Sequence, residues 1–106
     1  MPLTLKEENN SLAVLLRGEL DHHVSEKMRV EIDSAVREKL PPELVLDFGK
    51  VEFMDSSGIG LVLGRYRLMQ ELGGKLVLRN LPGHIRRVMR VAGIGNLAIR
   101  EEEKTE

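Results

Sequence analysis

The middle of the chain passes from a compact apolar run to apolar residues at helical spacing. Residues 44–48 are mostly aliphatic or aromatic, and from about residue 59 to 72 apolar positions recur at helical intervals. This succession is typical of a buried parallel strand that leads into a crossover helix. The polar bend at 54–58 between them is therefore expected at the carboxyl end of a strand, where α/β sheets expose functional groups.

Two shorter apolar segments precede this unit. Residues 3–7 and 12–16 are predicted to be strands, and the Asn-rich link between them favours an antiparallel hairpin. Gly18 is expected to end the second strand. A single apolar stripe on an otherwise charged segment predicts a helix from Val24 to Leu40, which the following Pro41 ends because proline lacks the N–H group.

Gly73 and the glycine after it are expected to end the central helix. Residues 75–79 predict another buried strand, 84–91 a third helix and 97–99 a short last strand. The sequence therefore predicts a small α/β domain over residues 1–100, with a mixed four- to five-stranded sheet and three to four helices. The remaining residues, 101–106, are expected to be a charged C-terminal tail.

The composition excludes several classes of protein. The chain has 106 residues, enough for one hydrophobic core, and 42% of them are hydrophobic. The net charge of -1 gives no field that attracts nucleic acid or an anionic membrane. Cysteine is absent, and no apolar run reaches the roughly 18 residues that span a bilayer. We expect a cytoplasmic protein with no direct nucleic-acid or membrane partner.

Enzyme and metal motifs are incomplete. A nucleophile elbow needs glycine two residues before the serine, where Ser56 has Met54. His22 and His23 point in divergent directions, and His84 is the only other histidine, so a metal shell is not complete. We therefore expect no catalytic residue, no metal and no cofactor.

The serine pair in the bend has a structural and a functional interpretation. Either serine can cap the following helix by accepting a hydrogen bond, and either can accept a phosphate. A helix N-terminus favours an anion by about 0.3–1 kcal/mol. Each like-charge pair at about 4 Å across a docked interface costs around 4 kcal/mol at an effective dielectric near 20. Phosphorylation is thus expected to release a partner and to leave the domain folded.

Three segments together carry a family resemblance: residues 18–23, with the order Gly-Glu-Leu-Asp-His-His, residues 53–60 around the serine pair, and residues 63–66. They resemble the anti-sigma-factor antagonists of the STAS family, especially the sporulation branch that controls the forespore sigma factor F. The similarity extends from about residue 3 to 100. One departure is that family members commonly continue into a last apolar-faced helix, whereas this chain continues into charged residues.

The resemblance implies a phosphorylation switch without chemistry of its own. Ser56 is expected to be phosphorylated by the anti-sigma factor, which is itself an ATP-dependent serine protein kinase. The unphosphorylated form binds that kinase and frees the sigma factor, and a serine phosphatase restores it. The expected partner-binding residues are Asp21, His22, Asp55, Ser56, Ser57 and Gly58.

Three alternatives remain open at this point. The chain can be a STAS-type antagonist of a stress or other partner-switching pathway. It can instead be a small nucleotide-binding domain that uses Gly58 and Gly60, although the third glycine of the fingerprint comes one residue too late. A third possibility is an unmodified scaffold that binds a partner through the Gly60 and Gly64 face of its helix. The structural interpretation of these small residues is that they let the helix approach the sheet closely.

Overall fold

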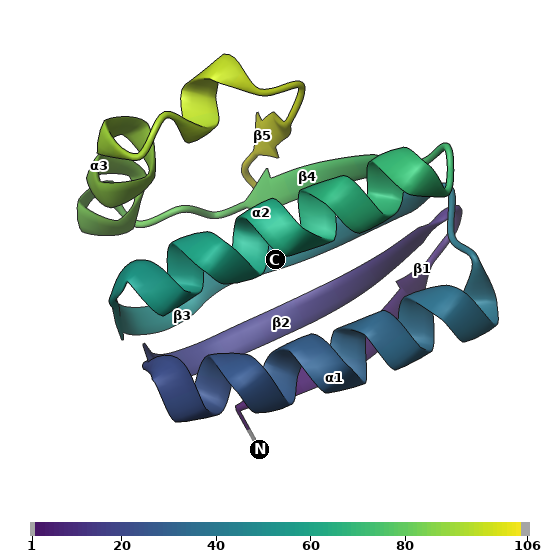
Figure 1. Cartoon of the computed structure of the whole chain (residues 1–106), viewed down its shortest axis with the longest axis horizontal. Coiled ribbons are helices and arrows are strands. Elements are labelled where there is room, and N and C mark those ends of the chain that lie inside the picture. Colours follow the sequence, from purple (N-terminus) through teal and green to yellow (C-terminus); the bar gives the residue numbers. More distant parts are fainter. Residues whose placement is uncertain (1, 105–106) are drawn as a thin grey trace.

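A computed structural model describes residues 2–104 as one five-stranded sheet with helices packed against it (Figure 1). The strands are β1 (Leu3–Glu8), β2 (Ser11–Leu20), β3 (Glu43–Met54), β4 (Lys75–Arg79) and β5 (Arg100–Glu102). The helices are α1 (His22–Lys39), α2 (Ser56–Glu71) and α3 (Gly83–Val91), followed by a 3-10 turn, η1 (Ile94–Asn96). The predicted α/β class with a mixed sheet is confirmed.

The strands lie in the sheet in the order in which they occur in the chain. β1 and β2 form the predicted antiparallel hairpin, and β2, β3, β4 and β5 are parallel to one another. Parallel neighbours need crossover connections, and α1 and α2 supply the first two. Figure 1 shows these helices running side by side across the sheet. Both therefore begin at the same edge, where β2 and β3 end.

The main core lies between the sheet and the helices. Alternate residues of the central strands point into it, together with the buried faces of all three helices. Its largest fully buried side chains are Phe48, Leu12, Leu16, Leu20, Met28, Ile32, Leu44, Leu46, Met69, Leu76, Leu78 and Ile85. The intervening strand residues Ala13, Val45 and Val77 form a separate small cluster.

Arg79 is a buried charge that links several strands. Its side chain is buried, with Nε 3.0 Å from Asp47 Oδ2 and Nη1 3.0 Å from Glu8 Oε1. The hydrogen bond from Arg79 is the main cause that lowers the pKa of the Glu8 carboxyl, and Lys104 lowers it further. These ion pairs join β1, β3 and β4 through side chains.

Two strands are longer than the sequence suggested. Gly18 does not end β2: with φ at +81° it lies at an irregularity in the β2–β3 pairing, and the strand continues to Leu20. A glycine in this conformation absorbs a β-bulge without steric conflict. β3 likewise continues beyond Phe48 to Met54 because the extended β2 offers it pairing partners.

The last strand was predicted at the wrong place. Residues 97–99 are not a strand, and Leu97 and Ile99 instead pack against the core. β5 follows at Arg100–Glu102, so it enters the segment expected to be a charged tail. Electrostatic contacts hold it, since Arg100 lies 3.3 Å from Glu43 Oε2 and the Asn80 N–H donates to the Glu102 carbonyl. The end of that predicted tail, residues 105–106, lies outside the described residues.

Acid should weaken the link between β1 and β4. A glutamate with a lowered folded-state pKa stabilises the fold above its unfolded-state value of about 4.3, and this contribution is lost as the pH falls through the folded-state value. Glu8→Gln should therefore destabilise the protein by about 1–3 kcal/mol at neutral pH, as expected for a hydrogen bond to a charged group. Urea unfolding at several pH values measures this difference.

The wild-type advantage over Glu8→Gln should shrink as the pH falls below the unfolded-state pKa of about 4.3, and it should disappear once Glu8 is protonated in the folded protein as well. Glu31→Gln, at an exposed position of α1, is the matched control and should unfold like the wild type at neutral pH. A difference between Glu8→Gln and wild type that persists unchanged in acid would show that packing, not the ion pair, is responsible.

Candidate functional site

The candidate site lies where β2 and β3 end level with each other. The pairing register sets Leu20 opposite Met54, and the Asp55 N–H is 3.5 Å from the Leu20 carbonyl oxygen. The next residue of each strand is an aspartate, Asp21 or Asp55, and a helix follows immediately. The register therefore brings two helix N-termini together at one edge of the sheet.

Both helices are capped by these aspartates. Asp21 Oδ1 accepts a hydrogen bond from the Val24 N–H at 2.9 Å, and Asp55 Oδ1 accepts one from the Ser57 N–H at 2.8 Å. Such bonds satisfy N–H groups that have no partner within the helix. Asp21 is therefore the N-cap of α1. The prediction that a serine caps α2 is wrong.

Because the aspartates cap them, both helices begin earlier in the chain than the sequence predicted. α1 begins at His22 rather than at Val24, and α2 begins at Ser56 rather than near Ile59. The expected polar bend is therefore reduced to little more than Asp55. Ser56 is the first residue of α2, where the partial positive charge of the helix dipole is concentrated.

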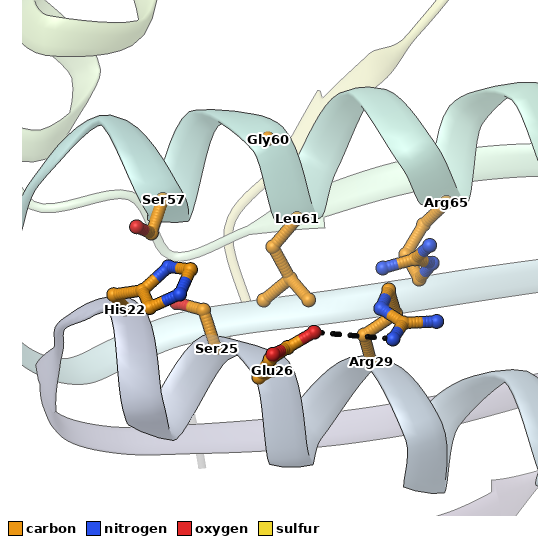
Figure 2. Close-up of a pocket in the computed structure, with 8 residues that line it drawn as sticks. All are labelled: His22, Ser25, Glu26, Arg29, Ser57, Gly60, Leu61 and Arg65. Carbon is orange, nitrogen blue, oxygen red and sulfur yellow. Dashed lines mark hydrogen bonds and ion pairs between the residues drawn. The ribbon is translucent and has the colours of Figure 1, made fainter.

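The two serines differ in exposure. Ser56 is exposed, whereas Ser57 is half-buried. Figure 2 shows the Ser57 side chain turned toward His22, across the space between α1 and α2. An incoming protein can therefore reach the Ser56 hydroxyl more directly than the Ser57 hydroxyl.

Gly58 is buried against the end of β3. A Cβ atom added there would lie 2.8 Å from Met54 Sδ and 2.9 Å from Met54 Cβ. Glycine is thus needed for α2 to start so close to the strand that precedes it. Gly58 and Gly60 both lie inside α2, whereas a dinucleotide fingerprint places its first glycine in the turn before the helix. The nucleotide hypothesis loses its structural basis.

Gly60 and Gly64 do not face the sheet, so the predicted close approach at these positions is wrong. A Cβ atom added at either would have no neighbouring atom within 4 Å. The buried side of α2 is instead formed by larger residues that include Leu61, Arg65 and Leu68. The strip of small residues looked like a packing surface only because the sequence does not show which side of the helix meets the sheet.

A groove between α1 and α2 was not predicted. It is an open groove with a volume of ≈ 170 Å³, and it is lined by His22, Ser25, Glu26, Arg29, Ser57, Gly60, Leu61 and Arg65. The available signal was Arg65, which continues the apolar row of Leu61 and Leu68 at helical spacing and is itself only 5% exposed. A buried arginine in such a row indicates a polar feature under the helix.

Phe53 is a further residue that the sequence analysis did not select. It precedes the site by three residues and is 51% exposed, although it is one of only two phenylalanines in the chain. Aromatic residues are enriched in protein–protein interfaces. Within residues 2–104, no group of three His, Asp or Glu side chains is arranged to hold a metal ion.

Membrane-spanning character is absent from the helices that the structure describes. None of those within residues 2–104 has both the length and the apolar sequence required to cross a bilayer.

Comparison with known proteins relates this chain and its fold to one family. The family model described as "Mlab, STAS domain" matches residues 3–101. An anti-sigma F factor antagonist from Paenibacillus polymyxa is 33% identical over 94 residues, which cover 89% of this chain and 80% of that protein.

Two solved structures of the anti-sigma factor antagonist SpoIIAA are also similar. The unphosphorylated form aligns with a TM-score of 0.78 at 31% identity, covering 97% of this chain and 89% of that one. The phosphorylated form from Bacillus aligns with a TM-score of 0.76 at 33% identity, covering 98% of this chain and 92% of that one. Both forms of that protein thus share the fold described here.

Gly58→Ala should destabilise the protein. The added methyl group overpacks the contact with Met54, which typically costs about 1–3 kcal/mol, and the better helix propensity of alanine returns only part of this. Gly60→Ala is the matched control, because its methyl group meets no neighbour and should stabilise the protein by about 0.5–1 kcal/mol. Urea unfolding of both variants measures the difference, and equal stabilities would contradict the packing described for Gly58.

Proposed function

Because this chain belongs to the STAS-domain family, among the anti-sigma-factor antagonists, we propose that it is a phosphorylation-gated binding protein with no catalytic activity. The unphosphorylated form binds an anti-sigma factor that is also a serine protein kinase, and this binding releases the sigma factor. The kinase then phosphorylates Ser56, which ends the interaction. A serine phosphatase removes the phosphate and returns the protein to the binding form.

The exposure of Ser56 is the observation that carries this proposal. Its hydroxyl lies on the first residue of α2, outside the cap that Asp55 forms with the Ser57 N–H. A kinase must bring its nucleotide phosphate to the hydroxyl, so an exposed residue at the edge of a rigid element suits the reaction. Ser57, half-buried and turned toward His22, suits it less.

Electrostatics supports release of the partner by the phosphate. The group adds about -1.5 to -2 charges beside Asp55 and on the same edge as Asp21. The helix dipole stabilises this added negative charge by about 0.3–1 kcal/mol. Each pair of like charges between the phosphate and a docked protein costs around 4 kcal/mol at 4 Å and an effective dielectric near 20. The penalty therefore falls on the complex, and the similar fold of both SpoIIAA forms is consistent with an intact phosphorylated domain.

The surface around Ser56 has the features of a docking site. Asp21, His22 and Asp55 supply polar groups, and Phe53 adds an exposed aromatic side chain nearby in the chain. Gly58 contributes indirectly, since it allows α2 to begin at this edge. The similarity to the sigma F antagonist supports the forespore pathway over a stress pathway.

Incubation of the protein with the anti-sigma factor kinase from the same genome and ATP should add one phosphate, at Ser56. Ser56→Ala should block the reaction and retain binding, because the alanine removes the acceptor without adding charge. Phosphorylated wild-type protein should bind the kinase at least about a hundredfold more weakly, equivalent to about 2.8 kcal/mol. Phosphosite mapping and calorimetry measure these results.

Ser57→Ala is the matched control and should be phosphorylated like the wild type. Phosphate on Ser57 in the wild-type protein would contradict the assignment of the acceptor. Undiminished affinity of the phosphorylated protein would contradict the switch itself.

Asp21 allows capping to be separated from docking. Asp21→Ala should destabilise α1 by about 1 kcal/mol, whereas Asp21→Asn should keep the stability because asparagine caps equally well. If the carboxylate takes part in docking, both variants should bind the kinase about tenfold more weakly, which corresponds to about 1.4 kcal/mol. Unfolding and binding measurements on the pair test this, and wild-type affinity for Asp21→Asn would restrict Asp21 to capping.

A further inference from the structure

The groove between α1 and α2 contains buried polar groups that the protein itself does not satisfy. Within residues 2–104, neither the Ser25 hydroxyl nor the Arg65 Nη1 has a hydrogen-bond partner. Both residues line the groove, and they are only 6% and 5% exposed. An unpaired buried donor is destabilising, so each such group in a native protein calls for a physical explanation.

Among residues 2–104, Asp33 is the counter-charge that lies against Arg65. Its Nε lies 2.9 Å from Asp33 Oδ1, but the two atoms are not aligned as a hydrogen bond. Burial lowers the pKa of the Arg65 guanidinium, Asp33 raises it, and the positive charge of Arg29 lowers it again. The Arg65 guanidinium is thus paired on one side only, and it is close enough to Arg29 for the two charges to repel.

Arg29 completes a donor-rich wall. Its Nη2 lies 3.3 Å from Glu26 Oε1 on the same helix, in an ion pair that is about half exposed. Figure 2 shows the Arg29 and Arg65 side chains extending toward one another from α1 and α2. Ser25 and Ser57 add hydroxyl groups toward the other end of the groove.

We propose that this groove receives the carboxylate of an acidic side chain of the protein that docks at Ser56. A planar carboxylate accepts the parallel N–H groups of a guanidinium, and its charge would relieve the repulsion between Arg29 and Arg65. This inference rests on the proposed function, because the same partner must cover both the groove and the neighbouring α2 N-terminus.

The size and the openness of the groove agree with such an occupant. Its ≈ 170 Å³ is more than ten times the roughly 10–15 Å³ that one water molecule requires. Gly60 forms part of the lining and projects no side chain, and a Cβ added there would meet no atom within 4 Å. The glycine therefore leaves a way in from the exposed side of α2.

Gly60→Leu tests whether the groove is used. The leucine should block access to Arg65 and weaken binding to the anti-sigma factor kinase at least about tenfold. Gly64→Leu is the matched control: it lies one turn further on, also has no neighbour within 4 Å, and is not part of the groove lining. Wild-type affinity for Gly60→Leu, or an equal loss in both variants, would overturn the proposal.

Arg65→Gln and Asp33→Asn test whether the partner binds to the positive charge of Arg65. Both variants break the same internal ion pair, so a purely structural role predicts that both lose stability and affinity together. The proposal instead predicts an affinity loss of at least about tenfold for Arg65→Gln, whereas Asp33→Asn, which leaves Arg65 without its internal counter-charge, should bind as well as the wild type or better. Parallel losses in both variants would overturn it.

Phosphorylation of the wild-type protein separates this inference from the proposed function. If the kinase binds wild-type protein and phosphorylates Ser56, but Gly60→Leu and Arg65→Gln bind equally well, only the groove assignment fails. If the kinase neither binds nor phosphorylates the wild type, the proposed function fails, and the groove assignment fails with it.

Discussion

The parallel pairing of β2 with β3 is the constraint on which the site depends. Because Leu20 lies opposite Met54, both strands end at the same level, and the aspartate that follows each strand can cap a helix. A shift in register would separate the two helix N-termini along the sheet edge. The irregularity at Gly18 matters for the same reason, since it adjusts the alignment shortly before the strands end.

The same arrangement explains why the groove exists. Helices that begin side by side and run in the same direction bring matching turns face to face. At this interface Leu61 fills the middle, and Arg65 and Ser25 are buried with donors that have no hydrogen-bond partner within residues 2–104. A fully apolar row would have closed the interface. The arginine keeps a polar site between α1 and α2, next to the exposed edge that carries Ser56.

The sequence predicted the fold class, the hairpin, the crossover helices and a serine pair that follows the end of a strand, because these depend on local apolar periodicity and on turn residues. It did not predict where β3 ends or where β5 begins, because strand pairing sets these positions. β3 extends to Met54 only because β2 is long enough to pair with it, and β5 forms at Arg100 through contacts with Glu43 and Asn80, both distant in the chain.

The candidate site was predicted in part. Residues near the serines were identified from the bend and from the family resemblance, but the sequence did not decide between Ser56 and Ser57 without that resemblance. Their different exposures follow from the start of α2 at Ser56, which depends on the Asp55 cap. The groove was missed because the facing side of α1 is known only once α1 and α2 are placed together.

The cap at Asp55 has one more consequence. The hydrogen bonds described at the start of α2 involve the carboxylate and the main chain of Asp55, and none of them uses the Ser56 hydroxyl. These hydrogen bonds therefore do not depend on the hydroxyl that we propose is phosphorylated. We therefore expect the proportion of the two forms to be set by the enzymes that act on the hydroxyl, rather than by unfolding and turnover of the chain.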